Sequence, residues 1–470
     1  MNISKLQIAL IGGAIFFVVI VLLVLSGILP GLKDGGSENG MLKIWGFDKR
    51  EIFNEGIKTY TEKNQGISIN YQQKDSTNWE LNILNAIARG ESPDILILPS
   101  DYLKKLSDKL SVAPKNLITE RELSQQFISS ALFFLTSQKE ILGIPLYVDP
   151  LVLYWNKDIF TKELIPLPPS TWDEFLETSQ RITKKDSADN ITISGSAMGR
   201  AINIQNAPEI LTALFLQSGE KIMDETGKII LGDPINIGNV AIRPAESALR
   251  FFTEFSDQQK TSRSWSSSFA EAQETFLAGK TAMYIGFASE YEEMKRKNPH
   301  VEIGISNIPS LDGKKSTFGR LFAFVVPRTS QNYLLAWNFA KFFASSENSK
   351  IYSNALGLVS PKRDLFTNYQ SDSIKSIFSQ SALSLELWND PDPIKSRIIF
   401  KDLIENMALK KDIMRNLLET AKAISENTPT DEKVQLENKI LDAMRNFLVS
   451  VESYPHLKAS EQFILLQSCV

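Results

Sequence analysis

The hydrophobic and polar positions divide this chain into one long apolar run and a much longer patterned remainder. Ile8–Leu29 contains no charged residue and ends at Pro30. About twenty helical residues cross a hydrocarbon core of roughly 30 Å, whereas a cleavable signal has an apolar core of only about 7–15 residues. The run therefore predicts one N-terminal transmembrane helix within residues 1–30, with a cleaved signal as the alternative. Lys5 on its short side favours a cytoplasmic N-terminus and an extracytoplasmic remainder after a linker, residues 31–40.

After the linker, strand-like and helix-like patterns alternate with short connections. Apolar residues recur at helical spacing in two segments and at strand spacing, or as a continuous run, in three others. This alternation is typical of a doubly wound parallel sheet, in which ligands bind outside the carboxyl ends of the strands. The predicted elements are the strands Met41–Phe47, Gly66–Tyr71 and Asp94–Leu98 and the helices Glu51–Asn64 and Asn78–Arg89.

The middle of the chain carries a second set of α/β signals. Thr171 and Glu174 have the spacing of a capping box, which predicts that a helix begins at Trp172. Beyond Ser373 the pattern is helical, without obvious strands. The other predicted elements are the strands Leu151–Trp155, Thr281–Ile285 and Leu321–Val326 and the helix Asn332–Phe343.

Composition narrows the possible chemistry. The chain is 43% hydrophobic and 23% charged with a net charge of −4, which indicates a folded protein without the basic surface of a nucleic-acid binder. The single cysteine, Cys469, excludes an intramolecular disulfide, and the only histidines are His300 and His456. Motifs for a nucleophile elbow, a zinc protease or a phosphate loop are missing from the sequence. We therefore expect no metal site, no cofactor and no catalytic residues.

Five phrases in order resemble the extracellular solute-binding proteins of ABC importers, in particular the carbohydrate-binding, maltose-binding-like group. The resemblance covers residues 41–366 well and residues 367–450 weakly. The phrases are LKIWGFD at 42–48, ILNAIARGESPDILIL at 83–98, GIPLYVDPLVLYWNKDIF with PPSTWDEF at 143–175, FAEAQETFLAGKTAMYIG at 269–286, and LFAFVVPRTS with GLVSPKRDLF at 321–366.

The resemblance implies an α/β, two-lobed periplasmic-binding-protein-like fold of type II, with a hinge that the chain crosses more than once. Lobe one would comprise residues 41–149 and 282–325, and lobe two would comprise residues 150–281 and 326–455, followed by a tail, 456–470. The ligand would lie in the cleft between the lobes, and binding would close them.

Sugars require flat apolar surfaces for their C–H faces and planar polar groups for their hydroxyls. Arg200 and Arg320 stand where neutral residues are expected; an arginine facing the cleft would favour an anionic solute, and a salt bridge at the rim is the alternative. Core packing is the alternative for Trp45, Phe287 and Trp388. The predicted ligand-binding residues are Trp45, Asp48, Asp101, Tyr147, Asp149, Arg200, Phe287, Tyr291, Arg320 and Trp388.

The sequence thus predicts a membrane-anchored, extracytoplasmic protein that binds a solute, in particular a sugar or oligosaccharide, and delivers it to an ABC permease. It is expected not to be an enzyme. A tethered sensor or adhesin with the same fold is one alternative. A surface glycosidase is the other, since paired carboxylates such as Asp149 and Asp173 occur in the sequence.

Overall fold

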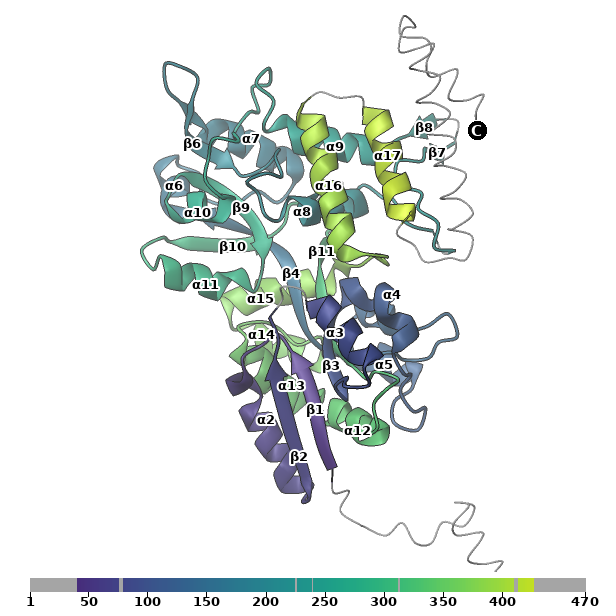
Figure 1. The fold of residues 1–470 in the computed structure, drawn as a ribbon. Helices are drawn as coiled ribbons and strands as arrows, with labels where there is room; N and C mark the ends of the chain where they lie inside the picture. Colours follow the sequence, from purple (N-terminus) through teal and green to yellow (C-terminus); the bar gives the residue numbers. More distant parts are fainter. Residues whose placement is uncertain are drawn as a thin grey trace, which may run out of the picture.

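The computed structural model describes residues 40–75, 79–224, 226–238, 240–311, 313–409 and 413–426. The predicted membrane helix, nearly all of the linker and the tail with Cys469 lie outside these ranges. None of the described helices is both long enough and apolar enough to cross a membrane. The described residues form two lobes, one above the other in Figure 1, with strands running between them.

One sheet path runs through both lobes in the order β2-β1-β3-β11-β4-β9-β6-β5, with β10 paired to β4 and β12 paired to β11. A separate hairpin is formed by β7 and β8. The strands are β1 Gly40–Gly46, β2 Ile67–Gln73, β3 Ile95–Pro99, β4 Ile144–Asn156, β5 Lys184–Lys185, β6 Ile191–Ser196, β7 Ile235–Ile237, β8 Val240–Ile242, β9 Thr281–Phe287, β10 Ile303–Asn307, β11 Thr317–Val325 and β12 Leu385–Glu386.

Lobe one consists of β1, β2 and β3 with the helices that cover them. The three strands are parallel, and β3 is buried along its whole length, as its continuous apolar run predicts. Gly90 ends the second helix with a φ of +70°, the left-handed conformation that favours glycine. The predicted strand–helix–strand–helix–strand order is confirmed. The helices of lobe one are α2 Arg50–Lys63, α3 Trp79–Ala88, α4 Leu103–Leu106, α5 Glu120–Gln126, α12 Tyr333–Phe343 and α13 Ser346–Ala355.

Lobe two contains β6, β9, β10 and the remaining large helices. The capping box of Thr171 and Glu174 is present at the start of α7, as the spacing predicts. Two helices from the end of the described chain, α16 and α17, pack against α8 and α9. The helices are α6 Lys157–Lys162, α7 Trp172–Ile182, α8 Ala207–Gln217, α9 Pro244–Glu254, α10 Ala272–Leu277, α11 Glu290–Lys297, α16 Pro393–Ala408 and α17 Ile413–Ser425. Two further helices, α14 Phe366–Tyr369 and α15 Ser373–Leu383, lie along the boundary between the lobes (Figure 1).

The long strand β4 carries the chain from one lobe to the other. Its first half pairs with β11 up to the pair Pro150–Gly319, and its second half, from Leu151 onward, pairs with β9 and β10. The strand therefore changes partners between Pro150 and Leu151. The chain crosses back along β11 and returns to lobe two before α16, so the predicted multiple crossing is present.

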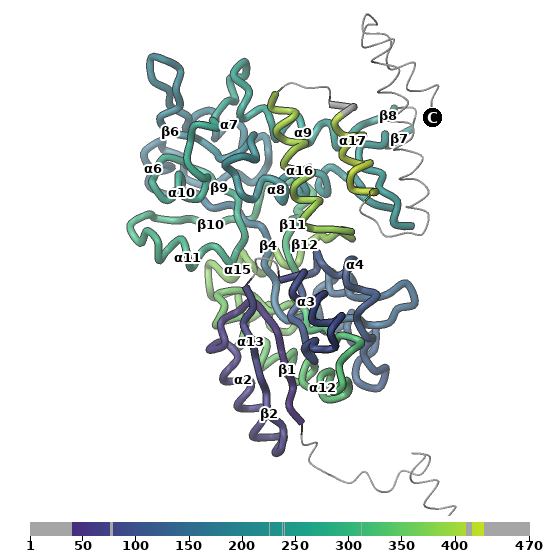
Figure 2. Tube along the Cα trace, in the orientation of Figure 1, coloured from purple at the N-terminus to yellow at the C-terminus, as the bar shows by residue number. Residues whose placement is uncertain are grey.

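The predicted lobe boundaries need two corrections. Residues 282–307 were predicted in lobe one, yet β9 and β10 pair with the second half of β4 and belong to lobe two. The segment after residue 326 was predicted in lobe two, yet α12 and α13 pack on α2 of lobe one. The tube trace shows both helices in that lobe (Figure 2). Phe343 of α12 packs its ring 5.5 Å from that of Phe53. A local apolar pattern predicts that a strand or helix forms, but it does not specify which distant surface buries that element.

Candidate functional site

A cavity of about 630 Å³ lies between the two lobes and is lined by residues of both. Lobe one contributes residues that directly follow two parallel strands: Phe47 and Asp48 after β1, and Asp101 and Tyr102 after β3. This is the carboxyl edge of the sheet, where the strand pattern predicts a ligand site. The volume is within the range of small-molecule sites.

Aromatic rings form much of the lobe-one wall. Trp79 contacts Phe47 and Tyr102 edge to face, with ring centroids 5.1 and 4.6 Å apart. Tyr147 of β4 and Phe322 of β11 stack at 4.4 Å with an interplanar angle of 14°. All five rings belong to residues that line the cavity. They provide flat apolar surfaces next to carboxylates, an arrangement that suits the two kinds of surface of a sugar ring.

Asp48 is held by tyrosines at the edge of this wall. Its Oδ2 accepts hydrogen bonds from Tyr352 Oη at 2.5 Å and from Tyr147 Oη at 3.2 Å, and its carbonyl accepts one from Tyr71 Oη at 2.6 Å. Burial raises the pKa of Asp48, and the hydrogen bonds from Tyr352 and Tyr147 oppose that rise. The carboxyl group is thus fixed in position before any ligand arrives.

Asp149 lies where β4 crosses between the lobes. Its carboxylate accepts hydrogen bonds from Ser289 N at 2.9 Å and Ser289 Oγ at 2.7 Å, which connect it to the region just before α11. Burial raises the pKa of Asp149 to about 6, against the lowering effects of Ser289 and of the Arg320 charge. Arg320 pairs with Asp149 in the register of β11 and β4.

Arg320 connects carboxylates of the two lobes. Its Nε lies 3.2 Å from Asp101 Oδ2 in lobe one, and its Nη2 lies 3.8 Å from Glu209 Oε1 in the first turn of α8 in lobe two. The same Glu209 oxygen binds Arg397 of α16. Phe287 lies beneath the guanidinium of Arg320, with the ring centroid 4.5 Å from Cζ.

The lobe-two wall includes the segment that leads into α16. Trp388 and Phe400 line the cavity together with Ile394 and Ile398, which are half exposed. Asp390 is buried there; its Oδ1 accepts hydrogen bonds from Ser396 Oγ at 2.6 Å and from the main-chain N–H of Asp392 at 3.0 Å. Burial raises the pKa of Asp390 to about 7, with smaller contributions from the charges of Asp101 and Asp392.

The cavity brings together six of the ten predicted residues and leaves out four. The six that line it are Asp48, Asp101, Tyr147, Asp149, Arg320 and Trp388.

Three of the other four are aromatic residues that pack within the fold. Trp45 is buried within β1 between β2 and β3, and Lys74 Nζ lies 3.8 Å from its ring centroid. Phe287 supports Arg320 from below, and Tyr291 packs against the core from α11.

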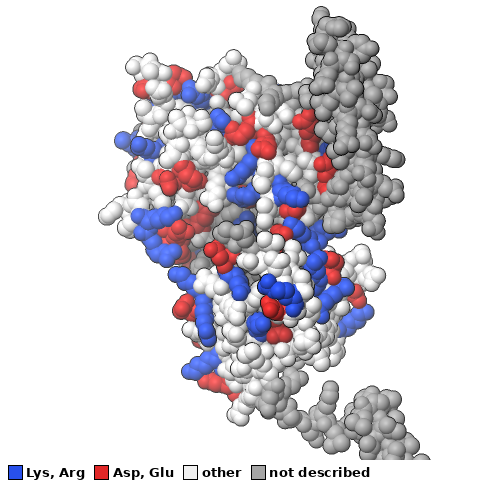
Figure 3. Space-filling view, in the orientation of Figure 1, with Lys and Arg blue, Asp and Glu red and all other residues white. Residues whose placement is uncertain are grey.

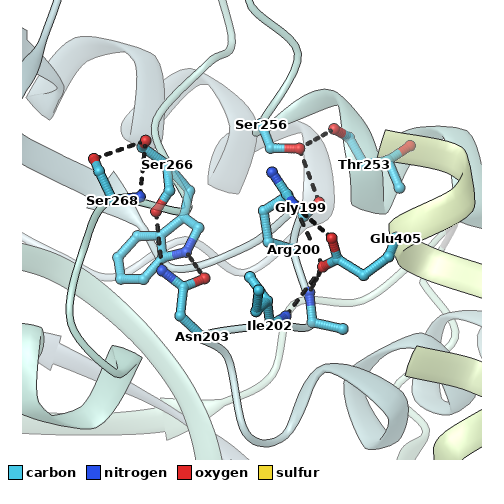
Figure 4. A network of polar contacts seen from close by, with 11 residues as sticks. Gly199, Arg200, Ile202, Asn203, Thr253, Ser256, Ser266, Ser268 and Glu405 are labelled. Carbon is cyan, nitrogen blue, oxygen red and sulfur yellow. Dashed lines mark hydrogen bonds and ion pairs between the residues drawn. The ribbon is translucent and has the colours of Figure 1, made fainter. Parts of the chain in front are cut away.

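Arg200, the fourth, is held by an ion pair inside lobe two. Its Nη2 lies 2.5 Å from Glu405 Oε2 of α16, and the two side chains point toward one another in Figure 4. The other oxygen, Glu405 Oε1, accepts from the main-chain N–H groups of Ala201 and Ile202. The prediction that Arg200 faces a ligand is therefore wrong, and the alternative, a salt bridge, is correct.

Several residues that line the cavity are not among the ten that the sequence predicts. Phe47 and Tyr102 could have been found, because each is adjacent in the chain to a predicted residue at the end of a parallel strand. Glu209, Asp390 and Arg397 gave no comparable signal, because they belong to helices or loops that only the docking of the lobes brings to the cleft.

Among the described residues, no group of three or more His, Cys, Asp or Glu is arranged to hold a metal ion. Lys and Arg alternate with Asp and Glu over the face seen in Figure 3.

A model of the bacterial extracellular solute-binding protein family matches residues 47–350, well over half of the chain. The chain belongs to this family. The match covers both lobes and all the strands of the crossing, and it confirms the resemblance inferred from the sequence phrases. A model of the LemA family matches residues 402–470, of which the structure describes only the end of α16 and α17.

Relatives with assigned names are also binding proteins. A putative binding protein of Brucella abortus is 23% identical over 335 residues, covering 67% of this solute-binding protein and 76% of the relative. A galactooligosaccharide-binding protein of Bacillus subtilis is 25% identical over 329 residues, covering 64% of this chain and 69% of the relative.

Solved structures support the fold. A cyclo/maltodextrin-binding protein complexed with maltotetraose superposes with a TM-score of 0.69 at 17% identity, covering 85% of this chain and all of that one. A cyclic α-maltosyl-1,6-maltose binding protein from Arthrobacter globiformis gives 0.69 at 15% identity, covering 83% and 98%. At these identities the likeness establishes the two-lobed α/β architecture alone.

Proposed function

We propose that this protein captures a saccharide outside the cell in the cleft between its lobes and delivers it to an ABC permease. The observation that carries the proposal is that aromatic faces and carboxylates from both lobes line one cavity of about 630 Å³. A ligand that contacts both walls stabilises the closed arrangement of the lobes over an open one, because only the closed arrangement makes both sets of contacts. Membership of the solute-binding family supports binding without chemical conversion.

The proposal includes a membrane tether. The uncharged segment Ile8–Leu29 is long enough to span a bilayer as a helix, and Lys5 before it supports an orientation with the lobes on the outer side. A tether holds the loaded protein near its transporter and raises its effective concentration there. Deleting residues 1–30 should move the protein from the membrane fraction to the soluble fraction; recovery of the full-length protein in the soluble fraction would argue against the tether.

The test of binding uses the full chain in detergent with a panel of neutral di- and trisaccharides that differ in linkage. A ligand present at 100 times its Kd and bound only by the native state stabilises that state by about 2.7 kcal/mol, which raises the melting temperature measurably. Isothermal titration then gives the Kd. We expect one linkage class to bind at micromolar concentration and to be recovered chemically unchanged. Hydrolysis of the ligand would support the glycosidase alternative, and no binding across the panel would contradict the proposal.

A further inference from the structure

The segment that leads into α16 forms part of the lobe-two wall of the cavity, and its charged side chains are bound by other parts of the protein. Asp390 is buried and accepts a hydrogen bond from Ser396 Oγ at 2.6 Å. Arg397 donates to Glu209 and to the carbonyl of Gln205, the latter at 2.5 Å. This part of the wall therefore uses its charged groups for contacts within the protein.

Two isoleucines of the same segment are exposed to the cavity. Ile394 and Ile398 line it, and they are 48% and 55% exposed. They are four residues apart in α16, so their side chains lie next to each other on one face of the helix. Exposed apolar side chains that gather in a cavity are typical of a ligand contact. The residues of α16 that are buried in lobe two instead are Ser396, Phe400, Leu403, Ile404 and Met407.

Three aromatic residues of lobe one line the same cavity near these isoleucines. This lobe-one aromatic cluster consists of Phe47, Trp79 and Tyr102. Trp79 is followed in the chain by Glu80, whose Oε1 lies 2.5 Å from Lys105 Nζ. The same ammonium group lies 3.0 Å from Asp392 Oδ2, two residues before Ile394. The apolar surfaces of the two lobes therefore come together at one end of the cavity.

We infer that the cleft binds a saccharide that carries an aryl group, and that this group lies between the two isoleucines of α16 and the lobe-one aromatic cluster. The inference rests on the proposed function and narrows its ligand class. A branched aliphatic side chain offers neither a flat face nor a hydrogen-bonding group, so a sugar ring placed against it would lose water from its hydroxyls without a replacement. An aryl group has no such hydroxyls to desolvate, and it gains apolar burial against both lobes together with edge-to-face contacts to the rings.

The test compares glycosides that differ in one substituent. Methyl glycosides of maltose, cellobiose and lactose are titrated by calorimetry into the full chain in nanodiscs, with empty nanodiscs as the blank. Nanodiscs replace detergent, because an alkyl glycoside detergent would itself present an apolar group on a sugar. Each methyl glycoside is compared with the phenyl glycoside and with a methyl glycoside benzylated at the non-reducing end, so that the ring is offered at either end of the saccharide.

At least one aryl form should bind at least about 10-fold more tightly than its methyl counterpart, a difference of about 1.4 kcal/mol that burial of the ring can supply. A smaller gain in every series, with binding of a methyl glycoside, overturns the inference and leaves the proposed function standing. Binding by none of the compounds removes both.

Two variants identify the surface responsible. Ile394→Thr and Ile398→Thr keep the branching at Cβ but remove apolar surface from the cavity, so each should reduce the gain of the aryl form by at least about 3-fold and leave the affinity for the methyl glycoside unchanged. Ile202→Thr is the matched control, because Ile202 is 70% exposed on lobe two and does not line the cavity; its gain should equal that of the parent protein. An unchanged gain in both cleft variants would overturn the assignment. Equal losses of affinity for the aryl and methyl forms would also overturn it, since the isoleucines would then act through closure of the lobes.

Discussion

Lys105 Nζ lies 3.0 Å from Asp392 Oδ2, and this contact joins α4 of lobe one to the N-terminus of α16 of lobe two. The same ammonium group lies 2.5 Å from Glu80 Oε1 on α3. Burial acts to lower the pKa of Lys105, but the hydrogen bonds that its ammonium group donates to Glu80 and Asp392 raise the pKa above its ordinary value. The triad links the two lobes and is screened little by solvent, because the two carboxylate side chains are at most 10% exposed.

Replacing Lys105 by Met should loosen the contact between the lobes. The substitution leaves Glu80 and Asp392 without their cation, and breaking a pair that is largely buried is costly. We expect the free energy of unfolding to fall by about 2 kcal/mol, less than for a fully buried pair, and the radius of gyration without ligand to increase. Urea titration and small-angle X-ray scattering measure the two effects. Lys58→Met, which removes an exposed pair with Glu62 on α2, is the control and should change neither quantity noticeably.

The crossing between the lobes depends on close contact at Gly319. A Cβ atom at this position would lie 2.6 Å from the carbonyl oxygen of Asp149 and 2.6 Å from Cα of Pro150, and neither backbone atom can rotate away. Gly319→Ala should therefore push β11 and β4 apart where the chain changes lobes, at a cost of about 1–3 kcal/mol. Urea unfolding tests the cost. A variant of unchanged stability would show that the crossing is looser than the structure indicates.

The parallel sheet of lobe one and part of the cleft could be predicted because both depend on local pattern. The continuous apolar run of β3 requires burial on both faces, which is typical of a strand in a parallel sheet. In such sheets the ligand site lies outside the carboxyl ends of the strands. Asp48 and Asp101 follow such strands directly, so the sequence could place them at one edge. Trp45 does not reach the cleft, because it lies inside β1, before the strand ends at Gly46, and is flanked by β2 and β3.

The lobe-two wall could not be predicted, because it depends on long-range docking. Glu209 lies in the first turn of α8 and Arg397 lies in α16, so they meet only because α16 packs against α8. No spacing in the chain encodes that return. The same limit explains why the sequence predicts β9 in the wrong lobe. Its apolar run predicts a strand, but its pairing with Leu151–Trp155 of β4 depends on the tertiary structure.

Trp388 should contribute to binding more than to folding. It lines the cavity and is half buried, with its ring 6.3 Å from that of Phe400. Trp388→Ala removes an aromatic face and should weaken saccharide binding about 10-fold or more, while the free energy of unfolding changes little. Calorimetric titration of whichever saccharide binds the parent protein measures the loss. Trp337→Ala provides the contrast: this ring is fully buried in α12, so the variant should lose about 3–5 kcal/mol of stability. Equal losses of stability in the two variants would assign Trp388 to the core.

Asp390 should make the stability of the protein depend on pH. Burial raises its pKa from 3.8 to about 7, so the folded state holds a proton that the unfolded state releases near pH 4. The stabilisation by the neutral form is fully present below about pH 4 and is lost as the pH rises through 7. Asp390→Asn keeps an oxygen for the hydrogen bonds from Ser396 and from the main chain of Asp392 but cannot ionise.

The variant should therefore match the parent protein at pH 4 and become more stable than it by up to about 4 kcal/mol at pH 8, the equivalent of the shift in pKa. Urea unfolding at half-unit steps between pH 4 and 8 measures the difference, and the comparison cancels the titration of all other carboxyl groups. A difference between Asp390→Asn and the parent protein that stays constant from pH 4 to 8 would contradict the raised pKa of Asp390, and the lobe-two wall would then be open to water.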